Sequence, residues 1–229
     1  DRSLSISDVL HKGFVGIDLT SASQARPAVP VINAAVNPEA LPRGPGLVAA
    51  PRPIGLLLST VLAAIERRCG LQEAAAVVLQ RVSECGEPGV GELYKQTLGL
   101  LNFQDMPREV FGRQVAFNLV PDFAYGAAGT PGTGPSDEIE KEIRSITGGS
   151  SALAVSVVLA PVFHCHSAML RVVLPKGRGR AELLEALTSS GDVRVGGEDG
   201  PATPVERAGE AGGPAAGLPP AGPEGALWV

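Results

Sequence analysis

The stretch LVAAPRPIGLLLSTVL, residues 47–62, decides the fold because two different patterns meet in it. A short apolar run ends at Pro51, Arg52 and Pro53, and from Ile54 the apolar residues recur at helical spacing. Many α/β enzymes place a nucleophile, or bind a phosphate, where a strand turns into a helix in this way. Here the turn carries two prolines and an arginine, and no side chain that can attack a carbon atom.

Working outward, the apolar spacing predicts a helix from Ile54 that stops at Gly70. Helices are also predicted over 90–101, 136–146 and 180–187, and strands over 14–19, 46–50, 74–83, 113–121, 153–163, 167–174 and 192–195. We expect strand 14–19 to be buried and strand 74–83 to be buried on both faces. The order of these elements predicts a mixed sheet with helices on one face.

The composition is that of a globular protein, with 44% hydrophobic and 19% charged residues among 229. A net charge of -5 argues against nucleic acid or an anionic membrane as the main partner. The longest apolar stretch, residues 53–65, is too short to span a bilayer. Three widely spaced cysteines form no disulfide framework, which favours a reducing, cytoplasmic location.

From Gly196 onward the chain is rich in Gly, Pro, Ala and Glu and shows no periodicity. Such a segment buries too little apolar area to offset the entropy of ordering it. We therefore expect residues 196–229 to form a disordered tail.

Five stretches, in order from about Phe14 to Val195, resemble motifs of one family. IDLTSASQ resembles I-D-N-S-S-A-F-R, and VPVINAAVNPEAL resembles V-P-L-V-V-P-E-V-N-P-E-A-L. LQRVSECGEPGVGEL is similar to Y-Q-A-V-S-G-A-G-x-x-G-V-x-E-L. FGRQVAFNLVP is similar to F-x-x-Q-I-A-F-N-x-I-P, and APVFHCHS resembles V-P-V-F-x-G-H-S. These are motifs of the aspartate-semialdehyde dehydrogenase family, and the APVF wording also resembles its catalytically degenerate Usg-like paralogues.

The resemblance implies an α/β (α+β) fold, namely the mixed, mostly antiparallel sheet of the glyceraldehyde-phosphate-dehydrogenase-like C-terminal (dimerisation) domain. Residues 1–46 would then be a remnant of the nucleotide-binding domain and the connection, residues 47–195 the dimerisation and catalytic domain, and residues 196–229 the tail. The family's Rossmann domain carries a Gly-rich turn. No strand, Gly-rich turn and helix precede Phe14, so we expect no cofactor in this chain as it stands, and NADP if a longer product supplies a Rossmann domain.

In the family, the strand-to-helix turn supplies a cysteine thiolate that attacks the aldehyde. The motif P-N-C matches Pro51, Arg52 and Pro53, so the position of the nucleophile is Pro53. Proline suits the first turn of a helix but cannot be a nucleophile. The resemblance therefore implies that the turn keeps its architecture and has lost its chemistry.

The family's acyl-site glutamine matches Gln80, and its general-base histidine matches His166. The arginine that binds the substrate carboxylate falls at Leu159, which offers shape but no bidentate fork. The phosphate-contacting lysine falls near Glu138, where a carboxylate would repel an anion. Two members of the catalytic set are thus kept, while the nucleophile and the substrate clamp are lost.

Other reactive side chains have alternative interpretations. Cys85 and Cys165 are each a relocated nucleophile with His166 as base, or a small buried thiol. His164 and His166 point to one face of a strand, but a zinc site needs a third ligand that the sequence does not place, so we expect no metal. Arg52 binds an anion at the helix N-terminus, is exposed, or pairs with a carboxylate. A further cysteine, Cys69, is expected in the core.

The sequence thus predicts a family member without dehydrogenase activity that acts as a dimeric scaffold or binding protein. The alternative is a working NADP-dependent semialdehyde dehydrogenase of amino-acid biosynthesis that uses an unusual nucleophile. We expect a homodimer, a hetero-dimer with an active paralogue being a further possibility, and no nucleic acid or membrane as partner.

Overall fold

A computed structural model gives the fold of most of the chain. It describes residues 13–20, 28–122, 134–149, 151–196, 203–209, 214–218 and 226–229. Within these ranges no helix is both long and apolar enough to cross a membrane.

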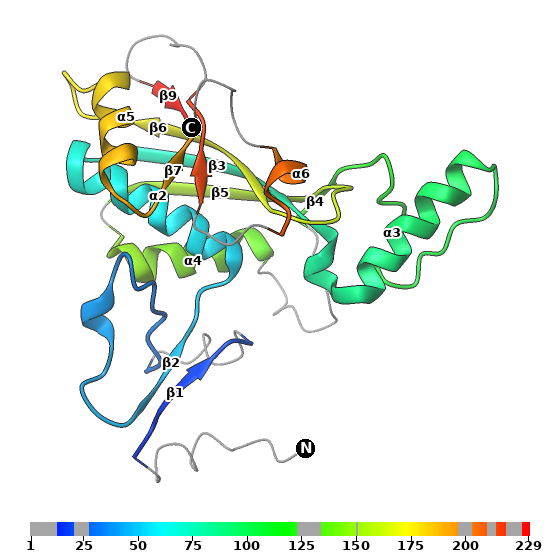
Figure 1. The fold of residues 1–229 in the computed structure, drawn as a ribbon, viewed down its shortest axis with the longest axis horizontal. Coiled ribbons are helices and arrows are strands. Elements are labelled where there is room, and N and C mark those ends of the chain that lie inside the picture. The colour runs from blue at the N-terminus through cyan, green and yellow to red at the C-terminus, as the bar shows by residue number, and fades with distance from the viewer. Residues whose placement is uncertain are drawn as a thin grey trace.

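The main sheet has five strands in the order β4-β5-β3-β6-β9 (Figure 1). The central strand β3 runs parallel to β5 and antiparallel to β6, and the two outer pairs are antiparallel. This confirms the predicted mixed, mostly antiparallel sheet. Its strands are β3 (Glu73–Gln80), β4 (Val120–Pro121), β5 (Ala152–Leu159), β6 (Ser167–Val173) and β9 (Ala226–Trp228).

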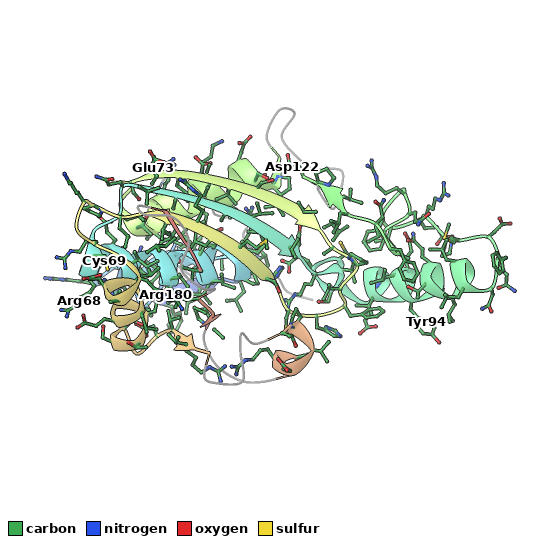
Figure 2. The ribbon with its side chains drawn as sticks, turned by 90° about the horizontal axis from the view of Figure 1, so that it is seen from above. Arg68, Cys69, Glu73, Tyr94, Asp122 and Arg180 are labelled. Carbon is green, nitrogen blue, oxygen red and sulfur yellow. The ribbon has the colours of Figure 1, made fainter. Side chains whose placement is uncertain are left out.

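Three helices cover one face of this sheet, as predicted, and a fourth projects from its end. The main hydrophobic core lies between the sheet and helices α2, α4 and α5. Both views show α3 extending away from this body, with Tyr94 on the projecting part (Figures 1 and 2). The helices are α2 (Pro53–Cys69), α3 (Gly86–Leu101), α4 (Pro135–Thr147), α5 (Arg180–Ser189) and the single turn α6 (Pro204–Arg207), with 3-10 turns η1 (Pro38–Ala40) and η2 (Val82–Cys85).

Helix α2 follows the sequence closely. Its predicted apolar positions are all buried, because they face the sheet and the two neighbouring helices. Gly70 ends the helix with a φ of 72°, a conformation that glycine adopts without the steric cost other residues pay. The helical periodicity therefore predicted which face of α2 is buried, and Gly70 marked where the helix ends.

Strand β3 is buried on only one face, which corrects the prediction of burial on both. Ala74, Ala76 and Val78 face the core, while Val77 on the opposite face is 41% exposed. The apolar run arises because the outward positions also carry alanine and valine. No described segment of this chain covers that face.

Residues 113–119 do not form the predicted strand, and only Val120–Pro121 pair with β5. The main chain here is held by a side chain instead: the amides of Val115 and Ala116 donate to Oε1 of Gln96, at 2.7 and 3.1 Å. Phe117 has a φ of 57°, which breaks the extended conformation. The alternation of apolar residues therefore reflects packing against α3 rather than a strand.

The predicted strand at 14–19 exists as β1 (Val15–Asp18) but is not buried. It pairs in parallel with β2 (Gly46–Ala49), and the two form a separate sheet. Phe14 and Ile17 of β1 are 62% and 65% exposed. The buried side of this pair lies on β2, where Ala49 packs in a small cluster with Ile146 of α4. Strand β2 thus belongs with the N-terminal strand, whereas the sequence-based boundary at residue 47 placed it with the main domain.

The described parts of the tail are ordered, which differs from the expected disorder of residues 196–229. Strand β7 (Arg194–Val195) pairs with β8 (Ala215–Ala216), and β9 adds a strand to the edge of β6. Leu227 and Val229 pack against the main core. Residues 197–202, 210–213 and 219–225 lie outside the described part of the chain.

Candidate functional site

The turn between β2 and α2 forms one side of the candidate site. Helix α2 begins at Pro53, and Arg52 precedes it in an extended conformation with a ψ of 153°. Proline costs nothing at this position because its missing N–H would have no partner within the helix. The turn therefore starts the helix as expected and places no nucleophile at its N-terminus.

Helix α4 supplies a carboxylate to this N-terminus. Glu142, 5% exposed, accepts a hydrogen bond of 2.9 Å from the Arg52 amide through Oε1. A Cβ on Gly55 would lie 1.7 Å from the same oxygen, so the carboxylate rests directly against the first turn of α2. A negative charge is favourable at a helix N-terminus. The place where this turn would bind an external anion is thus filled by the chain's own carboxylate.

The side chain of Arg52 is also paired. Its Nη2 lies 2.8 Å from Oε2 of Glu138, which is also on α4. Of the three interpretations that the sequence left open for Arg52, the structure shows the pairing with a carboxylate. Glu138, predicted to repel an anion, here neutralises a cation.

His166 lies just before β6, and its side chain is only 5% exposed. Its Nε2 lies 3.2 Å from Oε2 of Glu84 in the η2 turn. This hydrogen bond is the largest cause that lowers the pKa of the Glu84 carboxyl, and the charges of Arg81 and Arg52 lower it further. The histidine thus pairs with a carboxylate, and the ion pair of Arg81 with Glu84 extends the cluster at 3.7 Å.

Sequence reasoning missed both Arg81 and Glu84. The signal was present in LQRVSECG, where two charged residues stand at positions that are small in the family motif. Their pairing with His166 joins residues some eighty positions apart, which no local pattern reveals. The structure therefore adds an arginine and a carboxylate to the predicted site.

Gln80 is the last residue of β3, next to Arg81 of this cluster. The β3–β6 register pairs Leu79 with Ser167, and continuing it brings Gln80 opposite His166. Oε1 of Gln80, Nδ1 of His166 and Nε of Arg81 are buried and form no hydrogen bond within the described structure. Buried polar atoms of this kind are rare in folded proteins and call for an explanation.

Leu159 lies at the end of β5, opposite Gln80, and is fully buried. It packs in a second hydrophobic cluster with Val82, Leu93 and Phe111 at the base of α3. Its side chain therefore offers no surface to a ligand, and the position serves packing.

The cysteines differ sharply in environment. Cys85 is buried, and burial raises the pKa of its thiol to about 11, with Glu84 and Glu92 raising it further. A thiol in this state is a poor nucleophile near neutral pH. Cys69 is in the core as predicted, and burial raises its thiol pKa as well.

Cys165 is partly exposed and has a φ of 65°. This left-handed conformation favours glycine, which is the residue of the family motif at this position. His164 is exposed, and within the described residues no three metal-ligating side chains cluster. Nε2 of His166, the base that the sequence offered to Cys165, lies beside Glu84 instead.

Taken together, these residues can bind and orient polar groups, and the two buried thiols have raised pKa values. Arg52, Arg81 and His166 each lie beside a carboxylate.

Comparisons with known proteins agree with this geometry. A family model described as "Semialdehyde dehydrogenase, dimerisation domain" matches residues 62–210. An aspartate-semialdehyde dehydrogenase of Streptomyces akiyoshiensis is 31% identical over 197 residues, which cover 77% of this chain and 57% of that protein. A USG-1 protein homolog of Pseudomonas aeruginosa is 32% identical over 151 residues, covering 64% of this chain and 44% of that protein.

Among solved structures, a probable aspartate-semialdehyde dehydrogenase from Pseudomonas aeruginosa superposes with a TM-score of 0.83. It is 26% identical, and the match covers 96% of this chain and 67% of that one. The chain spans about half the length of the curated relatives it matches.

Proposed function

This chain belongs to the semialdehyde dehydrogenase family through its dimerisation domain, and on that premise we propose that it acts as a dimeric binding or scaffold protein without dehydrogenase activity. The observation that carries the proposal is the N-terminus of α2. Pro53 stands where the family resemblance places the thiol, and the carboxylate of Glu142 lies against the same turn. Without a thiolate, no acyl-enzyme can form at this position.

The rest of the site supports the same interpretation. Leu159, at the position of the substrate-binding arginine, is buried in a hydrophobic cluster. Glu138, near the position of the phosphate-contacting lysine, pairs with Arg52. His166 is engaged with Glu84, and the Cys85 thiol is held neutral by burial. Each change alone would weaken catalysis, and together they remove the nucleophile and the groups that would hold an anionic substrate.

We assign no cofactor contact to the described residues. The turn from β2 to α2 carries Arg and two Pro, whereas a dinucleotide phosphate needs glycines that let the backbone approach it closely. NADP would enter only through a nucleotide-binding domain in a longer product. The sparse, unpaired cysteines favour a cytoplasmic location for that product.

We also propose that the uncovered face of the main sheet forms a homodimer interface. Val77 and Met169 are direct cross-strand neighbours on this face, 41% and 60% exposed. Apolar side chains gathered on an uncovered sheet face are typical of an interaction surface. A hetero-dimer with an active family member would use the same surface.

The test is an assay of the purified protein with aspartate semialdehyde, phosphate and NADP, run beside an active aspartate-semialdehyde dehydrogenase as positive control. We expect no turnover above the enzyme-free background. Turnover above this background that thiol alkylation abolishes would contradict the proposal, because it would reveal a working cysteine.

Single substitutions identify such a cysteine if it exists. Cys165→Ser and Cys85→Ser each remove one thiol, and Cys69→Ser serves as a matched control in the core. Activity abolished by only one of the first two would establish the alternative, a dehydrogenase with a relocated nucleophile. Equal background in all variants is the outcome we expect.

A further inference from the structure

Several charged side chains meet where β3 ends, and one of them occupies the centre. Oε2 of Glu84 lies 3.2 Å from Nε2 of His166 and 3.7 Å from Nε of Arg81. Arg52 is near enough for its charge to lower the pKa of the Glu84 carboxyl. One carboxylate of the chain is therefore surrounded by cationic and hydrogen-bond-donating groups, as a bound carboxylate ligand would be.

Three buried atoms of Gln80, Arg81 and His166 have unused hydrogen-bonding capacity. With Nε2 of His166 directed at a carboxylate, the neutral imidazole carries its proton there and leaves Nδ1 as an acceptor. That Nδ1 and Oε1 of Gln80 are both buried and accept no hydrogen bond, and Nε of Arg81 donates none, although it lies 3.7 Å from Oε2 of Glu84. Leaving such atoms unpaired costs free energy, which a ligand with matching groups recovers.

Arg52 contributes charge rather than a direct contact. Its Nη2 is already bonded to Glu138, and its backbone amide to Glu142. The donors that a ligand would meet are therefore those of Arg81 and His166. The side chains of Arg81 and Glu84 are each 31% exposed, so solvent reaches the cluster from their side.

We propose that Arg81, His166 and Gln80 form a binding site for a small hydroxy-carboxylate, and that the carboxylate of Glu84 occupies this site in the resting chain. The ligand's carboxylate replaces that of Glu84 at Arg81 and His166, and its hydroxyl donates its one proton to one of the two buried acceptors. The proposal rests on the proposed function in placing a ligand rather than a reaction at this site. Because its test reads binding alone, its failure leaves the turnover assay unaffected.

The test compares glycolate with acetate, which lacks the hydroxyl, in titrations of the full chain at constant ionic strength. Binding is followed by the imidazole resonances of His166, with exposed His164 as an internal reference. Glu84→Gln removes the competing charge and keeps the side-chain length. We expect glycolate to bind this variant at least about tenfold more tightly than the wild-type chain, the factor expected from one charge-assisted hydrogen bond.

Glu87→Gln is the matched control, because it makes the same change in net charge on an exposed residue of α3. We expect it to bind glycolate as the wild-type chain does, and Glu84→Gln combined with Arg81→Gln to lose the gain. Equal affinities in the two single variants, or a gain that survives loss of Arg81, would overturn the site. Acetate binding as tightly as glycolate would overturn the role of the two acceptors.

Circular dichroism verifies that each variant is folded. If Glu84→Gln does not fold, Glu84→Asp replaces it, because the shorter carboxylate draws back from His166 by one methylene. A measurable gain in glycolate affinity is then expected, and an unchanged affinity would contradict the proposal.

Discussion

At the scale of single residues, the first turn of α2 shows how tightly the altered site is packed. Alanine normally stabilises a helix relative to glycine by about 0.5–1 kcal/mol. At Gly55, however, an added Cβ would lie 1.7 Å from Oε1 of Glu142 and 2.8 Å from its Cδ. The carboxylate would then have to leave the helix N-terminus and give up its hydrogen bond with the Arg52 amide.

We therefore predict that Gly55→Ala lowers the free energy of unfolding by about 1–3 kcal/mol, the cost of unpairing a buried hydrogen bond. Gly91→Ala in α3 is the control, because its Cβ would meet nothing within 4 Å. It should stabilise the protein by about 0.5–1 kcal/mol. Urea denaturation measures both, and two shifts of the same sign would contradict the packing described here.

Cys165 stores backbone strain. Its φ of 65° costs an L-residue roughly 1–2 kcal/mol, whereas glycine adopts it freely. We predict that Cys165→Gly stabilises the protein by about 0.5–1 kcal/mol after the added entropy of the unfolded chain is subtracted. Cys165→Ala keeps the strain and removes only the thiol, so its urea midpoint should stay close to that of the wild-type chain.

The Cys85 thiol makes stability depend on alkaline pH. Burial raises its pKa from 9.0 to about 11, so the folded state holds the proton more tightly than the unfolded state. Its contribution to stability is complete below pH 9 and is lost as the pH rises from 9 towards 11. We predict that between pH 8 and pH 10 the free energy of unfolding falls less steeply in Cys85→Ala than in the wild-type chain, with Cys165→Ala as control. Parallel curves for Cys85→Ala and the wild type would contradict this.

At the scale of elements, the periodicity of apolar residues predicted a helix correctly where one face of the element packs against the core. Helix α2 was predictable because one stripe of its residues faces the core along its whole length. The segment 113–119 was not, because Gln96 replaces the strand ladder with side-chain hydrogen bonds. Fully buried, this side chain accepts from two amides and donates to the carbonyls of Pro107 and Arg113 at 2.8 and 2.9 Å. No sequence period reports such a contact.

We predict that Gln96→Ala destabilises the protein by at least about 3 kcal/mol, because it leaves several buried main-chain groups without a partner. Lys95→Ala, at the exposed neighbouring position, should change the free energy of unfolding by no more than about 0.5 kcal/mol. Urea denaturation distinguishes the two. A cost for Gln96→Ala no larger than that of the control would mean that water satisfies these groups.

In the candidate site, too, some residues could be predicted from sequence motifs and others only from tertiary contacts. Resemblance of short motifs pointed to Gln80 and His166, and the continued β3–β6 register brings these two residues to one place. Arg81 and Glu84 were missed because they join the site through Glu84's contact with His166, which is distant in the sequence. The resemblance marked Leu159 as the position of a lost substrate-binding arginine. In the structure this side chain packs in a hydrophobic cluster. The sequence therefore pointed to individual residues of the candidate site, and only the tertiary contacts revealed how its charges are paired.

At the scale of the whole molecule, the main sheet is covered on one face only. Ala74, Ala76 and Val78 face three helices, while Val77 and Met169 meet no described part of this chain on the other face. The exposure of successive β3 residues thus alternates, as in a sheet with one free face, although the strand carries apolar residues on both faces. Under the proposed dimer, a second copy of the chain would cover the apolar side chains Val77 and Met169, and Arg171 would lie on the same face beside them.

We predict that the wild-type chain sediments as a dimer at micromolar concentration, and that Val77→Lys combined with Met169→Lys yields a monomer. Two lysines opposite one another on adjacent strands repel each other and their copies across the interface. Because both positions are exposed within one chain, the fold itself should tolerate the change. Leu184→Lys on α5, also an exposed apolar residue, is the control and should remain dimeric. A wild-type monomer would refute the interface, and a variant that still dimerises would place the contact on another surface.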